Sequence, residues 1–461
     1  MSVLFLANVG NREIQVPARD DLPTKDARLL GRALLEQWDN VADTLEMPIL
    51  GKAFEWVARK HGPLDRVVLF ASDQADPQYR NSDTILLAEV IQRLVGEKPK
   101  WKPLVNFDGL SIARVEHNPA DYDYMLRLYG TFMEELAREA TYDHVYLAIS
   151  GGTPAMASML LFQGIRAFGE RAQPLYITPH HAMPISLNIG QKLVVDALVE
   201  DLKISVTNYQ YHTTLSLLRQ HKSLLRETWS QLYPSIVAVV RYACERLNFN
   251  FVEAEATLFG ADRNLPPELA SRLHSLANDL QERDQAWLMR EELFGAEIDF
   301  YHQAYKDAVA NIFAFREELL RQLCIRYGMR LKQQDRKLDL DWLDTEPELS
   351  AYLKEKNIDV KRSVTTYVFE RILDFRAKTE PELQDFLDLI EKFKQLADIR
   401  NQSTHLHNGV SKTTIREAYG EVSAILQDLW ALYTRFTGKK PGSNPYDAIN
   451  ALILELVQAA P

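Results

Sequence analysis

The sequence predicts an α/β Rossmann-like parallel sheet domain followed by all-α helical domains. In about the first 200 residues, short apolar runs typical of strands alternate with longer amphipathic segments typical of helices. Beyond Asp196 the strand signals disappear and only helical periodicity remains. A chain of 461 residues is long enough for two or three domains. We expect an α/β domain at 1–200, a helical connector at 201–300 and a second helical domain at 301–461.

Four N-terminal segments have the composition of strands: Val3–Ala7, Arg66–Ala71, His144–Ile149 and Pro174–Thr178. Helices are expected between and after them at Asp26–Asp39, Asp83–Leu94, Tyr122–Glu139 and Pro154–Phe168. This alternation favours a parallel sheet with helices on both faces. Ligands of such open sheets gather beyond the carboxyl ends of the strands, so the loops at that edge are the first place to search for a site.

The C-terminal part has eight segments of helical periodicity: Thr213–Gln220, Ser235–Leu247, Glu268–Arg290, Ala308–Ile325, Val364–Phe375, Glu382–Ile399, Lys412–Arg435 and Tyr446–Gln458. Clusters of glycine, proline and asparagine interrupt the pattern at Phe259–Pro267 and Gly438–Pro445. We therefore expect an all-α half with a short terminal helix.

Composition excludes several classes of protein. The formal net charge is −11, so any nucleic acid must enter a local positive cleft and cannot coat a basic surface. Two cysteines, Cys244 and Cys324, suit a reducing cytoplasm and suggest neither a disulfide framework nor a zinc site. The first residues have no secretory leader, and no apolar run has the length of a membrane span. We expect a soluble cytoplasmic protein.

Polar and glycine-rich residues follow each predicted strand. These loops are Asn8-Val9-Gly10-Asn11-Arg12, Ser72-Asp73-Gln74, Ser150-Gly151-Gly152-Thr153-Pro154 and Thr178-Pro179-His180-His181. Because the carboxyl ends of parallel strands meet at one edge, the four loops should lie together. Asp73 and Gln74 have groups that could recognise a base, although polar loop residues often only face water. His180 and His181 have no third ligand at metal spacing and are interpreted as loop residues.

The loop Ser150-Gly151-Gly152-Thr153-Pro154 has the strongest individual signal. Two glycines let the backbone turn tightly and approach a ligand closely. Thr153 is a good helix N-cap, and Pro154 suits the first helical position. A helix N-terminus that opens just after such a turn could hold a phosphate or another anion. It could equally be an ordinary strand-to-helix turn, and the residues leave both interpretations open.

The other notable stretch follows the expected helix Glu382–Ile399. Its apolar residues recur every three or four positions and form one buried stripe: Leu383, Phe386, Leu387, Ile390, Phe393, Leu396 and Ala397. Arg400 continues that stripe, where a guanidinium is costly unless an anion meets it. His405 supplies a group that exchanges a proton near neutral pH. In a straight helix, five residues turn the side chain by about 140°, so the pair needs a bend or a second copy of the chain to act on one bond.

Arginine and histidine together suit the cleavage of RNA. When a 2′-hydroxyl attacks the adjacent phosphate, charge grows on the phosphate oxygens and the leaving 5′-oxygen takes a proton. The fork of Arg400 fits those oxygens, and His405 can transfer the proton. Asn401 could position Arg400 or the substrate, or could merely cap the helix, and His407 is a weaker candidate. The alternative is an ordinary helix end, whose arginine pairs with a carboxylate and whose histidine caps carbonyls.

Taken together, the chain resembles the ancillary ribonucleases of type III CRISPR systems. These join a CRISPR-associated Rossmann-fold (CARF) sensor to a HEPN (higher-eukaryote-and-prokaryote nucleotide-binding) ribonuclease domain. The sensor half is similar in Ser150 to Pro154, in Asp73-Gln74 and in Asp83-Thr84. The nuclease half is similar in Arg400-Asn401 followed by His405. The resemblance spans the whole chain in order and size, and it makes the domain at 1–200 a CARF sensor and that at 301–461 a HEPN nuclease.

The resemblance implies a homodimer that binds cyclic oligoadenylate, a second messenger, without any other cofactor. The residues that would face the ring are Asn8, Gly10, Asn11, Gln74, Ser150, Gly151, Gly152 and Thr153. The four-membered ring is slightly preferred to the six-membered one. It also implies that Arg400 and His405 of both copies, with Asn401, form a composite cleft. That cleft would cleave single-stranded RNA without metal, leaving a 2′,3′-cyclic phosphate and a 5′-hydroxyl, with no DNA or membrane partner.

Two other functions remain compatible with the residues. The chain could be a nucleotide-sensing regulator whose helical half binds a partner and cuts nothing. It could also be a HEPN-type toxin ribonuclease whose α/β half binds an ordinary nucleotide. Some sensor domains of the resembled family degrade their own ring ligand, and no residue here decides whether this one does.

Overall fold

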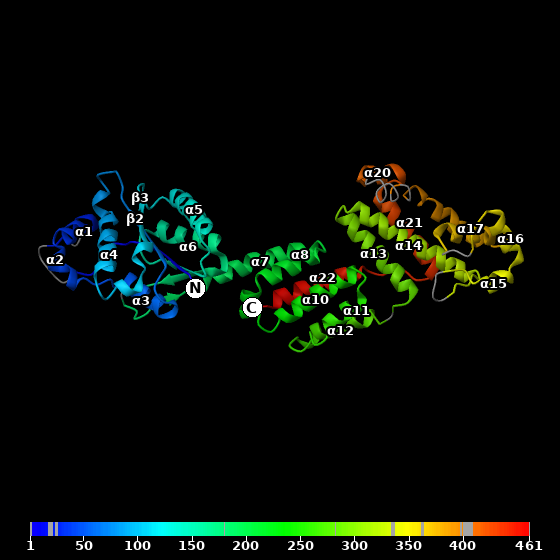
Figure 1. The fold of residues 1–461 in the computed structure, drawn as a ribbon, viewed down its shortest axis with the longest axis horizontal. Helices are drawn as coiled ribbons and strands as arrows, with labels where there is room; N and C mark the ends of the chain where they lie inside the picture. Colours follow the sequence, from blue (N-terminus) through cyan, green and yellow to red (C-terminus); the bar gives the residue numbers. More distant parts are fainter. Residues whose placement is uncertain are drawn as a thin grey trace. The chain divides into compact units, whose positions relative to one another are not determined.

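The computed structural model describes residues 2–16, 22–23, 26–178, 180–281, 283–332, 337–360, 364–396, 399 and 409–460. The chain forms two compact units, Met1–Glu200 and Asp201–Pro461 (Figure 1). The helix α7 (Ile189–Thr207) contains the boundary between them.

The N-terminal unit contains a six-stranded sheet in the order β3-β2-β1-β4-β5-β6. Its strands are β1 (Val3–Asn8), β2 (Arg66–Ser72), β3 (Leu110–Val115), β4 (His144–Ala148), β5 (Ala172–Tyr176) and β6 (Ile185–Ser186). The first five are parallel, and β6 is antiparallel to β5. The predicted parallel sheet is confirmed. Two strands were not predicted, because β3 mixes polar with apolar residues and β6 has only two residues.

Helices cover both faces of this sheet. They are α1 (Ala27–Glu36), α2 (Trp38–Val41), α3 (Leu50–His61), α4 (Ile85–Glu97), α5 (Tyr122–Glu139) and α6 (Pro154–Phe168). The bounds of α5 and α6 are those predicted. Helix α3 was not predicted, although Leu50, Ala53, Phe54 and Val57 are buried at helical spacing.

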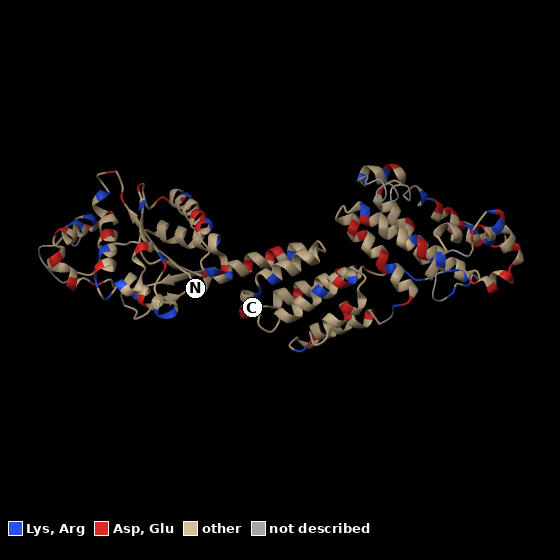
Figure 2. Cartoon of the chain, viewed as in Figure 1, with Lys and Arg blue, Asp and Glu red and all other residues tan. Residues whose placement is uncertain are grey.

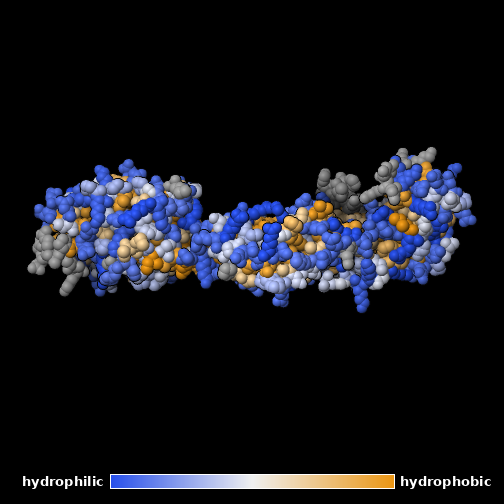
Figure 3. All heavy atoms as spheres, turned by 90° about the horizontal axis from the view of Figure 1, so that it is seen from below, coloured by the Kyte–Doolittle hydropathy of each residue, from blue (hydrophilic) through white to orange (hydrophobic). Residues whose placement is uncertain are grey.

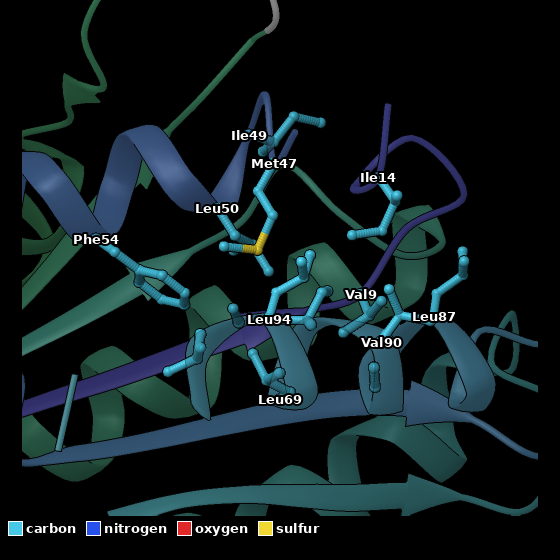
Figure 4. Close-up of a cluster of buried hydrophobic side chains, with 14 of the residues drawn as sticks. Val9, Ile14, Met47, Ile49, Leu50, Phe54, Leu69, Leu87, Val90 and Leu94 are labelled. Atoms are coloured by element: carbon cyan, nitrogen blue, oxygen red, sulfur yellow. The ribbon is translucent and has the colours of Figure 1, made fainter. Parts of the chain in front are cut away.

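Two hydrophobic cores follow from the alternation of side chains along β1. Phe5 and Ala7 belong to the core on the α3 and α4 side, where residues of both helices meet the loop after β1 (Figure 4). Leu4 and Leu6 belong to the core on the α5 and α6 side. The connections from β1 therefore leave on one face and those from β4 on the other. A crevice opens where this reversal occurs, at the carboxyl ends of the two strands.

The C-terminal unit is helical, as predicted. Its helices are α8 (Tyr211–Gln220), α9 (Lys222–Thr228), α10 (Tyr233–Leu247), α11 (Phe251–Leu258), α12 (Pro267–Asp279), α13 (Gln285–Tyr301), α14 (Tyr305–Arg326), α15 (Leu340–Asp344), α16 (Pro347–Glu355), α17 (Thr366–Ala377), α18 (Pro381–Glu391), α20 (Lys412–Ala418), α21 (Val422–Thr437) and α22 (Pro445–Ala459). Within the described part of this unit, the only extended pairing is the bridge between Leu331 and Leu338. The expected division of this half at residue 300 stays a prediction.

Two predicted helices are each broken into a pair. The expected helix Glu268–Arg290 is wrong, because α12 ends and α13 begins inside it. Asp284 starts α13 as an N-cap, its carboxylate accepting from the Trp287 N–H at 2.7 Å. The expected helix Lys412–Arg435 is wrong as well, because it is interrupted between α20 and α21. Gly420 lies in that gap with a φ of 120°, which an α-helix cannot include.

A buried ion pair joins four helices of the C-terminal unit. Arg246 on α10 donates to both carboxylate oxygens of Glu291 on α13, at 2.8 and 2.7 Å. Arg246 also donates to the Tyr242 hydroxyl at 2.8 Å and lies 2.6 Å from Asp279 at the end of α12. Tyr446 on α22 donates to Glu291 at 3.4 Å. Because Arg246 and Glu291 are both buried, each depends on the other for its stability.

Charges of both signs are interspersed along the helices of both units (Figure 2). The face of each unit in Figure 3 is mostly hydrophilic, with smaller hydrophobic patches. Among the described helices, none is both long enough and apolar enough to cross a membrane. Surface charge therefore identifies no site, and a candidate has to come from a cavity.

Replacing Arg246 by methionine should lower the free energy of unfolding of the helical unit by about 3–5 kcal/mol, since the buried Glu291 would lose the cation that donates to both of its oxygens and keep only Arg290, at 3.7 Å. Chemical denaturation measures this effect. The matched control is Arg272→Met, because Arg272 forms an exposed ion pair with Glu455 between α12 and α22. That variant should lose at most about 1 kcal/mol. Equal losses in the two variants would contradict a special role for the buried pair.

Candidate functional site

A cavity of about 620 Å³ lies at the carboxyl ends of β1, β2, β4 and β5. Its wall is formed by Val9, Gly10, Asn11, Arg12, Glu13, Ile49, Ser72, Gln74, Ser82, Asp83, Thr84, Pro119, Ser150, Gly151, Gly152, Thr153, Met156, Tyr176, Ile177, Thr178 and His180. The structure thus brings together all the residues expected to face a ligand except Asn8. The position agrees with the rule that open parallel sheets bind ligands at this edge.

The Gly151-Gly152 turn brings the loop after β4 against the loop after β1. A Cβ on Gly151 would lie 2.1 Å from the carbonyl oxygen of Asn8, a distance that no side chain can tolerate. Gly152 has a φ of 77°, and its Cβ would lie 2.9 Å from the Met156 sulfur. Both positions therefore require glycine, the first for close approach and the second for backbone conformation.

Ser150 and Thr153 fix the two ends of this turn. The Ser150 hydroxyl accepts a hydrogen bond from the Ile177 N–H at 2.5 Å, which ties the end of β4 to the end of β5. Thr153 caps α6, its hydroxyl accepting from the Met156 N–H at 3.2 Å and donating to the Pro119 carbonyl. Pro154 occupies the first turn of α6, as predicted. The N-terminus of α6 therefore opens beside the cavity in a fixed orientation.

Asn8 lies beneath the cavity and is not part of its wall. The strand β1 continues through this residue, so Asn8 follows Leu4 and Leu6 onto the face covered by α5 and α6. Its side-chain carbonyl accepts from the Tyr129 hydroxyl at 2.5 Å. Asn8 therefore differs from the other seven residues predicted to face the ligand. Its side chain lies behind the cavity wall and supports the loop that follows β1.

Neither Arg12 nor Glu13 was among the predicted ligand residues, although both follow Asn11 in the same loop. Arg12 is exposed and is, with His180, one of the basic side chains in the described wall of the cavity. Glu13 is buried, with only 1% of its surface exposed. A Cβ on Gly151 would lie 2.9 Å from its Oε1, so the carboxyl lies directly behind the Gly-Gly turn. The sequence feature that could have identified both residues is their position in a loop at the carboxyl end of a predicted strand.

Burial governs the protonation of Glu13. Desolvation raises the pKa of Glu13 to about 8, and the N–H groups of Leu50 and Gly10 oppose that rise only in part. Among the described residues, none makes a hydrogen bond of normal geometry to either carboxyl oxygen. A neutral carboxyl at this position does not repel an anion in the cavity, whereas an ionised one would.

The structure does not describe the residues that were expected to carry catalysis. Arg400, Asn401 and His405 lie outside the described residues. The apolar stripe that precedes them is confirmed where it is described, with five buried members: Leu383, Phe386, Ile390, Phe393 and Leu396. The predicted helix Glu382–Ile399 is interrupted, since α18 ends at Glu391 and a turn follows.

The comparisons with known proteins match the C-terminal part to one family. Residues 285–454 match the family described as Cas_Csm6 HEPN domain. This segment is similar to the HEPN domains of Csm6 proteins. It begins with the first residue of α13 and ends within α22.

The fold of the whole chain has a counterpart among solved structures. It is similar to Enterococcus italicus Csm6 bound to cyclic hexa-2′-fluoro-hexa-dAMP, with a TM-score of 0.62 over 99% of this chain and 100% of that one. The two sequences are 13% identical, so the likeness concerns the fold. A search of the curated proteins finds no match. The whole chain therefore has a Csm6-like fold, and its C-terminal segment matches a HEPN family, in agreement with the resemblance found in the sequence motifs.

Replacing Glu13 by glutamine should stabilise the N-terminal unit at alkaline pH. The folded pKa of about 8 exceeds the ordinary glutamate pKa of 4.5, so the native state binds an extra proton between these values and stability falls as pH rises through that window. A neutral glutamine avoids this loss, which amounts to about 3–5 kcal/mol. Unfolding measured at pH 5 and pH 9 should show the gain of Glu13→Gln at pH 9 alone. Glu36→Gln, an exposed change on α1, should behave as wild type at both pH values; a Glu13→Gln difference that is independent of pH would contradict the assignment.

Proposed function

We propose that the protein is an endoribonuclease of type III CRISPR defence that cleaves single-stranded RNA when its N-terminal cavity binds cyclic oligoadenylate. The observation that carries this proposal is a polar, glycine-walled cavity at the ligand edge of a Rossmann-like sheet, in a chain whose C-terminal segment is a Csm6-type HEPN domain.

The cavity suits a nucleotide chain. Phosphates would meet the backbone at Gly10, Gly151 and Gly152, the positive end of the α6 dipole and the side chain of Arg12. Bases would meet Gln74 and the wall near Thr178. The Csm6 of similar fold holds a cyclic hexa-deoxyadenylate analogue, which supports a cyclic oligoadenylate here. We retain the slight preference for the four-membered ring over the six-membered one.

A homodimer would complete this site. A ring with even symmetry presents equivalent faces to two identical cavities across a twofold axis. Apolar side chains near the cavity in sequence are exposed in the single chain: Tyr176, Met183, Ile185, Ile189 and Leu193. Tyr176 also belongs to the cavity wall. Burial of such residues between two copies would close the cavity over the ring.

In the proposed reaction, the 2′-hydroxyl of the RNA attacks the adjacent phosphorus and displaces the 5′-oxygen of the next nucleotide. Arg400 binds the phosphate oxygens and offsets the charge that grows on them. His405 transfers the proton, so that a 2′,3′-cyclic phosphate and a 5′-hydroxyl form without a metal ion. Asn401 positions Arg400 or the RNA. One Arg400 and one His405 from each copy form the shared cleft.

Activation follows from linkage between the two sites. Cyclic oligoadenylate can raise the cleavage rate only if it binds the active arrangement of the dimer more tightly than the inactive one. The proposal therefore requires the ring to bind with different affinity in the two states. A fluorogenic RNA assay without metal, run against rings of three to six adenylates, tests nuclease activity, activator and ring size together.

Substitution of Arg400 or His405 by alanine should reduce RNA cleavage by at least about 10²-fold, because the transition state loses a charge partner or a proton carrier. Binding of cyclic oligoadenylate, measured by calorimetry, should not change. His274→Ala serves as the control, since His274 is exposed on α12, where it pairs with Asp262 at 3.0 Å, and has no assigned role in cleavage. Full ring-stimulated cleavage in both Arg400→Ala and His405→Ala would rule out this catalytic pair.

Replacing Gly152 by valine should weaken the binding of cyclic oligoadenylate by at least about tenfold, or about 1.4 kcal/mol. A β-branched residue is strained at a φ of 77°, and its Cβ would press on Met156 in the cavity wall and on Asn8 behind it. Gly169→Val is the matched control, because Gly169 has a φ of 55° at the other end of α6 with open space around it. Similar ring affinity in the two variants would mean that the Gly-Gly turn has only a structural role.

A further inference from the structure

Gln74 is held in one orientation by a buried carboxylate. Its backbone N–H donates to Asp83 Oδ2 at 2.6 Å, and its side-chain Nε2 donates to Asp83 Oδ1 at 2.9 Å. Asp83 is fully buried, whereas Gln74 is half-buried and belongs to the cavity wall. Since a carboxylate only accepts hydrogen bonds, the amide nitrogen of Gln74 must face Asp83. Its carbonyl oxygen has no donor among the described residues and is the polar atom left for the cavity.

The support of Asp83 is itself rigid. Arg28 of α1 lies 3.7 Å from Asp83 Oδ2 and also pairs with Asp73, so a buried guanidinium offsets the carboxylate charge. Beside Asp83, the start of α4 is tied to the end of β2 by two hydrogen bonds. The Ser72 N–H donates to the Thr84 hydroxyl at 3.2 Å, and the Thr84 N–H donates to the Ser72 hydroxyl at 3.1 Å. A rotated Gln74 amide would therefore set its oxygen against a fixed acceptor.

We propose that Gln74 recognises the exocyclic amine of an adenine, and that Asp83 is the positioning residue that makes this contact selective. This inference rests on the proposed function of the cavity. The N6 amine of adenine is a donor and can meet the Gln74 carbonyl, whereas hypoxanthine and guanine carry an acceptor oxygen at that position. With the amide locked, two acceptors would face one another and the purine would be rejected. Selection of adenine thus depends on the Asp83 carboxylate, which does not itself need to touch the base.

The test compares the binding of cyclic adenylates with that of inosine rings of equal size. Four- and six-membered rings in 2′-fluoro form are used, because without a 2′-hydroxyl they cannot be consumed by attack on their own phosphates. Full-length wild-type protein should bind the adenylate ring at least about tenfold more tightly than the inosine ring. Calorimetry gives both dissociation constants, and their ratio is the quantity of interest because a general loss of stability does not change it.

Asp83→Asn should bring that ratio close to one. An asparagine can donate to the Gln74 side-chain carbonyl as well as accept from its amide N–H, so Gln74 can turn either group toward the base. Gln74→Leu should also reduce the ratio. Because Gln74 is half-buried, this variant serves as the test if Asp83→Asn fails to fold. Asp76→Asn is the matched control, since exposed Asp76 accepts from the Gln78 N–H at 2.9 Å in the same loop but does not line the cavity. Its ratio should equal that of wild type.

The outcomes separate this inference from the function on which it rests. Wild-type protein that binds the adenylate and inosine rings equally, or an unchanged ratio in both Asp83→Asn and Gln74→Leu, overturns the inference and leaves the sensor function intact. Wild-type protein that binds no ring of either size overturns the sensor function and the inference with it.

Discussion

The candidate site depends on one close backbone approach, that of Gly151 to the carbonyl oxygen of Asn8. A Cβ at Gly151 would lie 2.1 Å from that oxygen, so only glycine allows the loop after β4 to pack on the loop after β1. The parallel pairing of β1 with β4 brings the two loops to the same edge, and the turn between Ser150 and Thr153 then directs α6 away from it. Without this contact the cavity would lose its floor and the helix N-terminus its direction.

Much of the fold could be predicted from sequence because its signals are local. The helices α5 and α6 have strong apolar periodicity and caps such as Thr153, and their bounds were predicted correctly. The strand β3 lacks a continuous apolar run, since only Leu110 and Val115 at its ends are buried, and it forms because β2 offers a pairing edge. Breaks such as that before Asp284 depend on capping and tertiary packing, which periodicity does not record.

The candidate site was predictable to the extent that it consists of loops at one sheet edge. The cavity contains all the expected ligand residues except Asn8, whose side chain takes the alternating position of a strand residue. The contacts between these loops could not be predicted from the sequence. Examples are the buried carboxyl of Glu13 behind the Gly-Gly turn and the hydrogen bonds from Gln74 to Asp83, which the motifs that contain Gln74 and Asp83 do not show. These contacts determine the protonation of Glu13 and the orientation of the Gln74 amide, which cannot be read from the residue types alone.

The helix α22 has a consequence for how the protein is made. It packs on α10 and α12, which precede it by about 200 residues in the printed chain, and Asn450 accepts from the buried Tyr211 hydroxyl at 2.8 Å. The core around Arg246 and Glu291 therefore cannot close until α22 has been synthesised and can pack on these helices. The helices α10 and α12 therefore wait for a segment that is made much later, so this unit cannot fold in the order in which its helices are synthesised.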